Sequence, residues 1–257
     1  MAGIKIENFY DHVSKKNKSE PSVDYPNKKE IQINVPCRAL VCGKSGDGKT
    51  NTLLNLIKNI NAWQRYYLFA KNLHEPLYAE FIENIKTVEK KCGFQILFYS
   101  DNLNDLPPIK DFDENKKSTL FIFDDQVCEK GHAVKIMEEI WIRGRKDFLS
   151  TIYITQSYFD MPKLMRKNTD YVFFKKLNTT RDLTMTLKEY QKDDIPLKFE
   201  KELYNLSLIG SFTNFFMIDC NNNNPNMIYR KNFTGIPWKE LWNRLTPEQQ
   251  KKYKDKK

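Results

Sequence analysis

Short apolar runs and helically spaced apolar residues alternate along most of this chain. The runs are rich in aromatic and β-branched residues, a composition that favours strands. They lie at 38–43, 66–70, 94–100, 119–125, 150–155 and 170–177. Sets of apolar residues at helical spacing lie at 53–60, 77–88 and 134–141. This alternation predicts an α/β fold with a mostly parallel central sheet covered by helices on both faces.

The pattern also predicts three parts of the chain. Residues 1–30 are polar and Lys-rich, which is typical of a flexible basic arm. Residues 31–237 form the expected domain, and its first strand is predicted where Ile31, Ile33 and Val35 alternate before Pro36. Residues 238–257 are expected to form a C-terminal helix and a Lys-rich tail.

The last part of the domain departs from the strand–helix alternation. A helical pattern runs from Arg181 to about Gly210. Two strand-like segments follow, FTNFFMIDC and NMIYRKNF, with an Asn-Pro turn between them. We expect them to form an antiparallel hairpin at the edge of the sheet.

Length and composition narrow the class of protein. The 257 residues suit one sizeable core, and no apolar run approaches the ~20 residues that a membrane span needs. The first residues lack the apolar core of a signal peptide. Five scattered Cys and three His give no disulfide framework, no paired zinc spacing and little for a His-based hydrolase. The net charge of +9 favours an anionic partner such as nucleic acid.

The octet GKSGDGKT at 43–50 matches the phosphate-binding pattern G-x-x-x-x-G-K-[ST], with a buried strand before it and an amphipathic helix after it. Its glycines allow successive N–H groups to point at phosphate oxygens at a helix N-terminus. Lys49 is expected to reach the β- and γ-phosphates and Thr50 to ligate Mg²⁺. The predicted nucleotide-binding residues are Gly43, Lys44, Ser45, Gly46, Asp47, Gly48, Lys49, Thr50 and Asn51.

A second apolar strand, LFIFDDQ, ends in acid, as expected of the Walker B strand of a P-loop NTPase. Asp124 is the expected Mg²⁺ ligand, and Asp125 the expected catalytic acid that polarises the attacking water. Two strands are predicted between the octet and this strand, which indicates the P-loop class with an extra strand there. ATP is favoured over GTP, because the chain has no Asn-Lys-x-Asp.

Three more residues are candidates for catalysis. Gln156 directly follows a predicted strand, where its amide could orient water or detect loss of phosphate, or simply cap the strand. Arg143 and Arg145 lie after a predicted helix, where each could cap the helix C-terminus or reach a neighbouring subunit as an arginine finger. We favour the finger, with Arg145 ahead of Arg143.

Several segments together resemble the genome-packaging ATPases of virophages, poxviruses and related large DNA viruses, a branch of the FtsK–HerA superfamily. The resemblance spans about Val35 to Phe233, and its most specific part is ITQSYFDMPKLMRKNTDY. It implies a homo-oligomeric ring, a hexamer or a pentamer, that hydrolyses ATP with Mg²⁺ between its subunits. It also implies double-stranded DNA and capsid or portal-like vertex proteins as partners, and the host cytoplasm or the virion as location.

Basic residues within this segment and just beyond it are candidates for DNA contacts, although a solvated surface charge is the commoner role for such residues. They are Lys163, Arg166, Lys167, Lys175 and Lys176. Two departures from the family matter. Asp125 stands where much of the superfamily has Glu, so its role carries over less directly, and Lys146 stands where relatives often have His. The alternatives are a P-loop small-molecule kinase and a nucleotide-dependent assembly scaffold.

Overall fold

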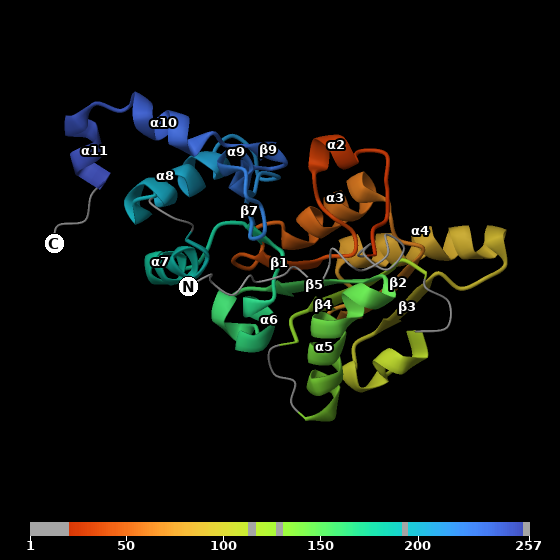
Figure 1. The fold of residues 1–257 in the computed structure, drawn as a ribbon. Coiled ribbons are helices and arrows are strands. Elements are labelled where there is room, and N and C mark those ends of the chain that lie inside the picture. Colours follow the sequence, from red (N-terminus) through yellow and green to blue (C-terminus); the bar gives the residue numbers. More distant parts are fainter. Residues whose placement is uncertain (1–20, 113–116, 127–130, 192–194, 254–257) are drawn as a thin grey trace, which may run out of the picture.

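A nine-stranded sheet forms the centre of the computed structural model, which describes residues 21–112, 117–126, 131–191 and 195–253 (Figure 1). Its strands run in the order β3-β2-β4-β5-β1-β6-β7-β8-β9. They are β1 (Arg38–Cys42), β2 (Arg65–Ala70), β3 (Leu97–Ser100), β4 (Thr119–Asp124), β5 (Leu149–Thr155), β6 (Tyr171–Phe174), β7 (Phe216–Asp219), β8 (Tyr229–Lys231) and β9 (Thr234–Gly235). The pairs from β3 to β6 are parallel, and those from β6 to β9 are antiparallel.

Helices cover both faces of this sheet. The α-helices are α2 (Lys28–Ile31), α3 (Lys49–Ile60), α4 (Pro76–Cys92), α5 (His132–Arg143), α6 (Lys163–Lys167), α7 (Thr180–Tyr190), α8 (Leu197–Leu208), α9 (Pro225–Ile228), α10 (Trp238–Arg244) and α11 (Pro247–Tyr253). Short 3₁₀ helices lie at Leu103–Asp105, Ile109–Phe112, Gly144–Asp147 and Tyr158–Asp160. None of the helices in the described ranges has the length and apolar character to span a bilayer.

The strands are buried on both sides, and successive side chains enter two separate cores. Leu53 on α3 and Phe81 on α4 pack with one face of the sheet. Met137 on α5, Leu187 on α7 and Leu203 on α8 pack with the other. This arrangement confirms the predicted α/β class, because a parallel sheet needs a helical layer on each face.

The strand order determines where the site forms. The two strands predicted between the octet and the acidic strand are β2 and β3, and in space they lie beyond β4. Strand β5 lies between β1 and β4 and pairs with both. The carboxyl ends of β4, β5 and β1 therefore meet at one edge, the usual position for a ligand in a parallel sheet.

The predicted antiparallel strands at the sheet edge are confirmed as β7 and β8. The helical pattern from Arg181 forms two helices, α7 and α8, and Pro196 directly precedes the second. After Pro237 the chain forms α10 and α11, which is one helix more than the C-terminal pattern predicted. Residues 254–257 of the expected Lys-rich tail lie outside the described residues.

The strand predicted at Ile31, Ile33 and Val35 is wrong. Ile31 ends the short helix α2, and the next residues form no strand, although all three side chains are buried. They are buried because the segment crosses the core beside Tyr25, whose hydroxyl donates to the Ile33 carbonyl at 2.7 Å. Tyr25 is itself buried, so the packed chain begins before residue 31. Residues 1–20 of the expected arm lie outside the described residues.

Candidate nucleotide site

The phosphate-binding loop at 43–50 is held between β5 and β6. The Gly43 N–H donates to the Thr155 carbonyl at 3.2 Å, and the Lys44 N–H donates to the Lys176 carbonyl at 2.8 Å. A Cβ on Gly43 would lie 2.4 Å from Cβ of Lys175, so only glycine fits where the loop passes β6. The Asp47 carboxylate accepts from the Lys176 N–H at 2.6 Å and closes the loop on that side.

The loop ends at the N-terminus of α3. Gly46 and Gly48 have φ angles of +73° and +80°, in the left-handed region that favours glycine. Gly48 caps α3, and no side chain among the described residues caps the helix in its place. The N–H groups of the first turn are therefore available to an anion, as a phosphate site requires.

Lys49 opens α3 and lies close to the acidic strand. Its ammonium donates to the Lys44 carbonyl at 3.0 Å, across the mouth of the loop. Burial lowers the pKa of Lys49, and the nearby Asp124 carboxylate opposes that shift. A bound phosphate would supply the negative charge that this partly buried cation needs.

Asp124 ends β4 as predicted and accepts from the Tyr78 hydroxyl at 2.6 Å. Burial raises the pKa of Asp124 to about 6, against the effects of the Tyr78 hydrogen bond and of Lys49. The Thr50 hydroxyl donates to the Glu75 carboxylate at 3.2 Å. A hydroxyl and a carboxylate offer the oxygen ligands that Mg²⁺ prefers, so Thr50 and Asp124 fit that ion.

The next residues hold the acidic strand in place. Asp125 is exposed, with a φ of 55°, and its N–H donates to the Ile154 carbonyl at 3.2 Å. The Gln126 amide is buried and donates to the carbonyls of Phe69 and Asp124. Gln126 therefore ties the ends of β2 and β4 together and leaves the Asp125 side chain in solvent at the mouth of the site.

Gln156 directly follows β5 and is exposed at the same edge. The Ile154 carbonyl accepts from the Asp125 N–H, after β4, and the Thr155 carbonyl accepts from the Gly43 N–H, after β1. Gln156 thus leaves the sheet between the acids and the phosphate-binding loop. The structure brings together the loop, both acids and this glutamine.

Sequence reasoning missed Glu75 and Tyr78. Both belong to the start of α4, where Glu75 is the N-cap and Pro76 the first residue of the helix. An acid before Pro at a helix start could have identified Glu75 as a cap. Its contact with Thr50 depends on the pairing of β2 with β4, which apolar periodicity does not reveal. The Asn51 amide nitrogen, beside the same loop, is buried without a hydrogen-bond partner among the described residues.

Arg145 lies at the opposite ends of the parallel strands, where β5 begins. It belongs to the 3₁₀ helix before β5, and its guanidinium lies 3.4 Å from Asp170, which directly precedes β6. Asp170 also accepts two hydrogen bonds from the Arg38 side chain, at 3.0 and 2.8 Å. Because a strand rises about 3.3 Å per residue, β1 alone separates Arg145 from the phosphate-binding loop by roughly 15 Å. Arg145 therefore does not reach the phosphate site of its own subunit.

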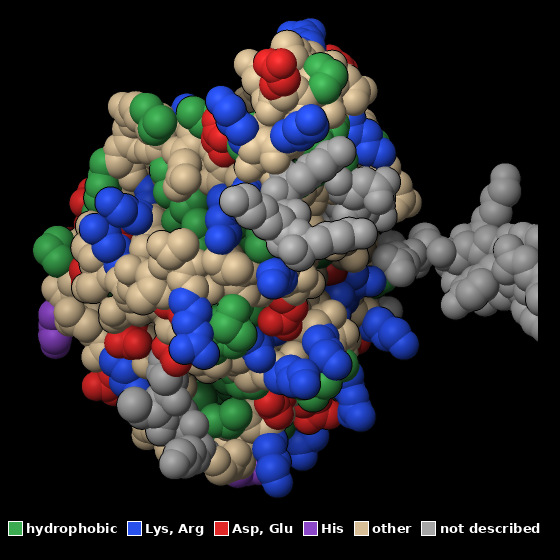
Figure 2. All heavy atoms as spheres, turned by 90° about the vertical axis from the view of Figure 1, so that its left-hand side faces the viewer, with side chains coloured by type: hydrophobic (Ala, Val, Ile, Leu, Met, Phe, Trp, Pro, Cys, Tyr) green, Lys and Arg blue, Asp and Glu red, His purple; other side chains and the backbone are tan. Residues whose placement is uncertain are grey.

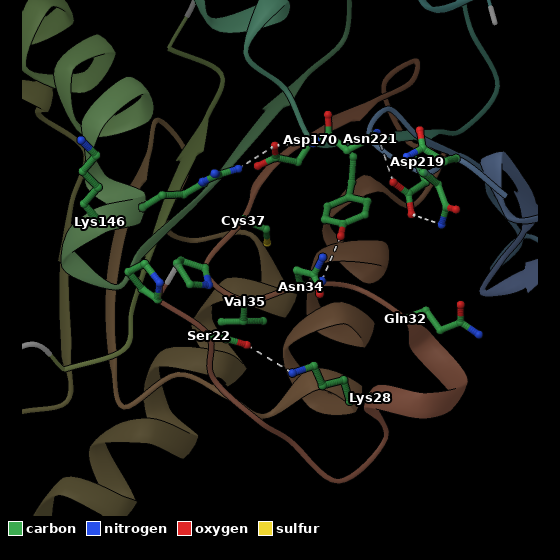
Figure 3. Close-up of a pocket in the computed structure, with 16 residues that line it drawn as sticks. Ser22, Lys28, Gln32, Asn34, Val35, Cys37, Lys146, Asp170, Asp219 and Asn221 are labelled. Atoms are coloured by element: carbon green, nitrogen blue, oxygen red, sulfur yellow. Dashed lines mark hydrogen bonds and ion pairs between the residues drawn. The ribbon is translucent and has the colours of Figure 1, made fainter. Parts of the chain in front are cut away.

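A cavity of about 1080 Å³ opens at this far edge, and Figure 3 shows Lys146, Asp170 and Asn221 among the residues around it. Asn221 donates to Asp170 at 2.8 Å. Arg143 is more exposed: its side chain is 72% exposed and pairs with Glu139, one turn earlier on α5. Arg143 and Arg145 thus lie at the amino ends of the parallel strands, and the phosphate-binding loop lies at their carboxyl ends.

The candidate DNA contacts differ in accessibility. Lys163, Lys167 and Lys176 are exposed. The Arg166 guanidinium lies 4.9 Å from the ring centroids of both Tyr158 and Phe159, so that side chain is held against the protein. Lys175 is buried and its ammonium donates to two backbone carbonyls, so it is not available to DNA in this structure.

Figure 2 shows the side of the molecule on which α7 and α8 lie. Lys and Arg side chains are spread across this face and are interspersed with Asp and Glu. Among the described residues, the positive charge on this side is therefore distributed and does not form one continuous basic field (Figure 2).

The fold and the site together define a P-loop ATPase, with the phosphate loop on β1 and the acids on β4. The particular family follows from comparison of sequences: the chain matches the family described as "Poxvirus A32 protein" over residues 27–191, more than half its length, and belongs to it. This confirms the resemblance to viral genome-packaging ATPases. No curated protein sequence matches the chain.

Solved structures share this fold. The DNA-packaging ATPase B204 from Sulfolobus turreted icosahedral virus is similar with a TM-score of 0.53 and 16% identity, covering 77% of this chain and 98% of that one. The genome-packaging NTPase B204 from Sulfolobus turreted icosahedral virus 2, in complex with AMPPCP, is similar with a TM-score of 0.51 and 16% identity, covering 76% and 96%. At these identities the likeness shows the fold.

Proposed function

We propose that this ATPase moves double-stranded DNA into a preformed viral capsid, as a ring whose active sites are completed between subunits. The observation that carries the proposal is the match to the A32 family across the segment holding the phosphate loop, the acids and Gln156. The similar B204 structure, in complex with AMPPCP, supports ATP as the nucleotide. We therefore expect capsid or vertex proteins as partners and the host cytoplasm or the virion as the location.

The residues of one subunit can bind and activate ATP. The N–H groups of the loop and the Lys49 ammonium hold the β- and γ-phosphates. Thr50 and Asp124 would hold Mg²⁺, which neutralises phosphate charge when bound. Gln156 orients a water toward the γ-phosphorus, and Asp125 or Glu75 accepts its proton. The new P–O bond forms as the bond to the β-phosphate oxygen breaks, and ADP leaves with that oxygen.

The two arginines act between subunits. An Arg that stabilises charge on the transferring phosphate contributes about 10³–10⁵ in rate. Arg143 and Arg145 lie at the sheet edge away from their own phosphate loop, so either can serve only a neighbouring subunit's site. The exposed lysines Lys163, Lys167 and Lys176 are the proposed DNA contacts, and binding through them would weaken with salt.

Steady-state ATP hydrolysis over a protein concentration series, with and without linear double-stranded DNA at low salt, tests this function. We expect turnover per subunit to rise with protein concentration and to rise again with DNA. Lys49→Ala should abolish hydrolysis, because the phosphate loses its cation. Turnover per subunit that changes with neither protein concentration nor DNA would contradict the ring motor. Transfer of phosphate to a small acceptor would support a kinase instead.

A further inference from the structure

A short loop, 209–214 between α8 and β7, places an aromatic ring against the phosphate-binding loop. Phe212 is 61% exposed, which is unusual for a large aromatic side chain. The tip of its ring nonetheless meets the nucleotide site, because a Cβ on Gly48 would lie 2.8 Å from its Cζ atom. Core packing explains neither the exposure of this ring nor its position at the start of α3.

A buried lysine holds this loop in place. The Lys175 ammonium donates to the carbonyl oxygens of Phe212 at 2.5 Å and Asn214 at 2.7 Å. It also lies 5.3 Å from the Phe212 ring centroid, within the range of a cation–π contact. Since Lys175 follows β6, the loop is fixed directly to the strand beside β1.

Side-chain amides add to this support. Asn214 donates to the Ile209 carbonyl at 2.9 Å, and Asn232 donates to the Asn214 side chain at 3.1 Å. The loop around Phe212 is thus held by hydrogen bonds from Lys175, directly after β6, and from Asn232, directly after β8, while the Phe212 ring remains exposed. A fixed backbone under an exposed aromatic ring is the arrangement of a pre-organised binding surface.

The ring lies on the correct side of the site to meet a nucleotide base. The acids and Gln156 lie on the β4 and β5 side of the phosphate-binding loop, where the γ-phosphate must be for hydrolysis. Phe212 lies on the opposite, β6 side. A triphosphate whose γ end points to the acids directs its nucleoside end toward β6.

We propose that Phe212 is the platform on which the nucleotide base stacks. This inference rests on the proposed binding of ATP at the loop. Aromatic stacking reads the face of a base and not its edge, so the platform would favour nucleotides with large bases and would not by itself separate adenine from guanine.

Two ligands separate base binding from phosphate binding. AMPPCP carries a base and a triphosphate, whereas inorganic tripolyphosphate carries only the phosphates. We would measure equilibrium binding of both, with Mg²⁺, to wild type, Phe212→Ala and Phe212→Trp. Ile209→Ala is the matched control, since Ile209 is 62% exposed on the same loop, whereas the three atoms nearest to a Cβ on Gly48 all belong to Phe212.

We expect Phe212→Ala to weaken AMPPCP binding at least about tenfold, the usual size of a lost base–aromatic stack, and to change tripolyphosphate binding by less than about twofold. Phe212→Trp should restore AMPPCP binding, and Ile209→Ala should change neither ligand. Equal weakening of both ligands would mean that the ring only shapes the phosphate loop, and no weakening of either would exclude a base contact. Wild type that binds neither ligand would instead contradict the proposed function.

Discussion

At the scale of single residues, the acids around Thr50 are held in different ways. Asp124 is partly buried and accepts a hydrogen bond from Tyr78, and Glu75 accepts one from Thr50. Asp125 is exposed, and its backbone N–H donates to the Ile154 carbonyl. A carboxylate that already contacts the expected metal ligand is better positioned to orient a water than one in solvent.

We therefore expect Glu75→Gln to lower ATP turnover at least as much as Asp125→Asn, by about 10² or more, the usual share of general base catalysis. AMPPCP binding by both variants should stay close to that of wild type, because neither acid holds the phosphates. Turnover measured with binding in parallel checks this. Full turnover in Glu75→Gln with loss in Asp125→Asn would assign the base to Asp125 alone.

The sequence could predict residues that belong to a continuous motif. The phosphate-binding octet and the acids of LFIFDDQ are such motifs, and Gln156 could be placed because it ends a strand. Glu75, Tyr78 and Phe212 could not be predicted. Each reaches the site from an element whose neighbours in space depend on strand order, and no local pattern determines that order.

At the scale of elements, apolar periodicity predicted the strands that are buried on both faces, because continuous apolar runs such as TLFIFDD suit no other position in this fold. The same reasoning failed at 31–35, where alternate burial came from an irregular segment that crosses the core. An alternating pattern indicates which side chains are buried. A β-strand is only one backbone conformation that buries alternate side chains.

Helix α8 carries a buried acid whose titration should affect stability. Glu200 is fully buried beside Tyr229 of β8, and burial raises its pKa from 4.5 to about 8. The folded state thus holds the proton more tightly than the unfolded state. Its contribution to stability is complete below about pH 4.5 and falls as the pH rises toward and through about 8.

Replacement of Glu200 by Gln should remove this dependence. We expect the free energy of unfolding of wild type to fall relative to that of Glu200→Gln by up to about 1.4 kcal/mol per pH unit between the two pKa values. Urea unfolding of both proteins at several pH values in that range measures the difference. Parallel curves would mean that Glu200 titrates normally in the folded protein.

At the scale of the whole molecule, the phosphate loop and the two candidate arginines lie at opposite ends of the parallel strands. The phosphate loop follows β1, whereas Arg143 and Arg145 precede β5. One copy can bring its arginine edge to the phosphate edge of the next only through a head-to-tail contact. Repetition of such a contact closes a ring when the rotation between subunits allows it.

Mixing two inactive variants tests this arrangement. Lys49→Ala removes the phosphate cation, and the double variant Arg143→Ala/Arg145→Ala removes both arginines. If the sites are shared, a random equal mixture forms some sites with an intact loop from one subunit and intact arginines from the next. About a quarter of the sites should then be complete, so ATP turnover should recover to about that fraction of wild type.

The single variants then decide which arginine acts. Arg244→Ala is the matched control for Arg143→Ala, because both side chains are largely exposed and pair with a glutamate one turn earlier. Arg244→Ala should keep wild-type turnover, whereas Arg145→Ala or Arg143→Ala should lower it while AMPPCP binding persists. Mixtures that stay inactive at every ratio, although each variant still assembles, would refute the shared site, because a site built within one subunit would lack either Lys49 or both arginines in every copy.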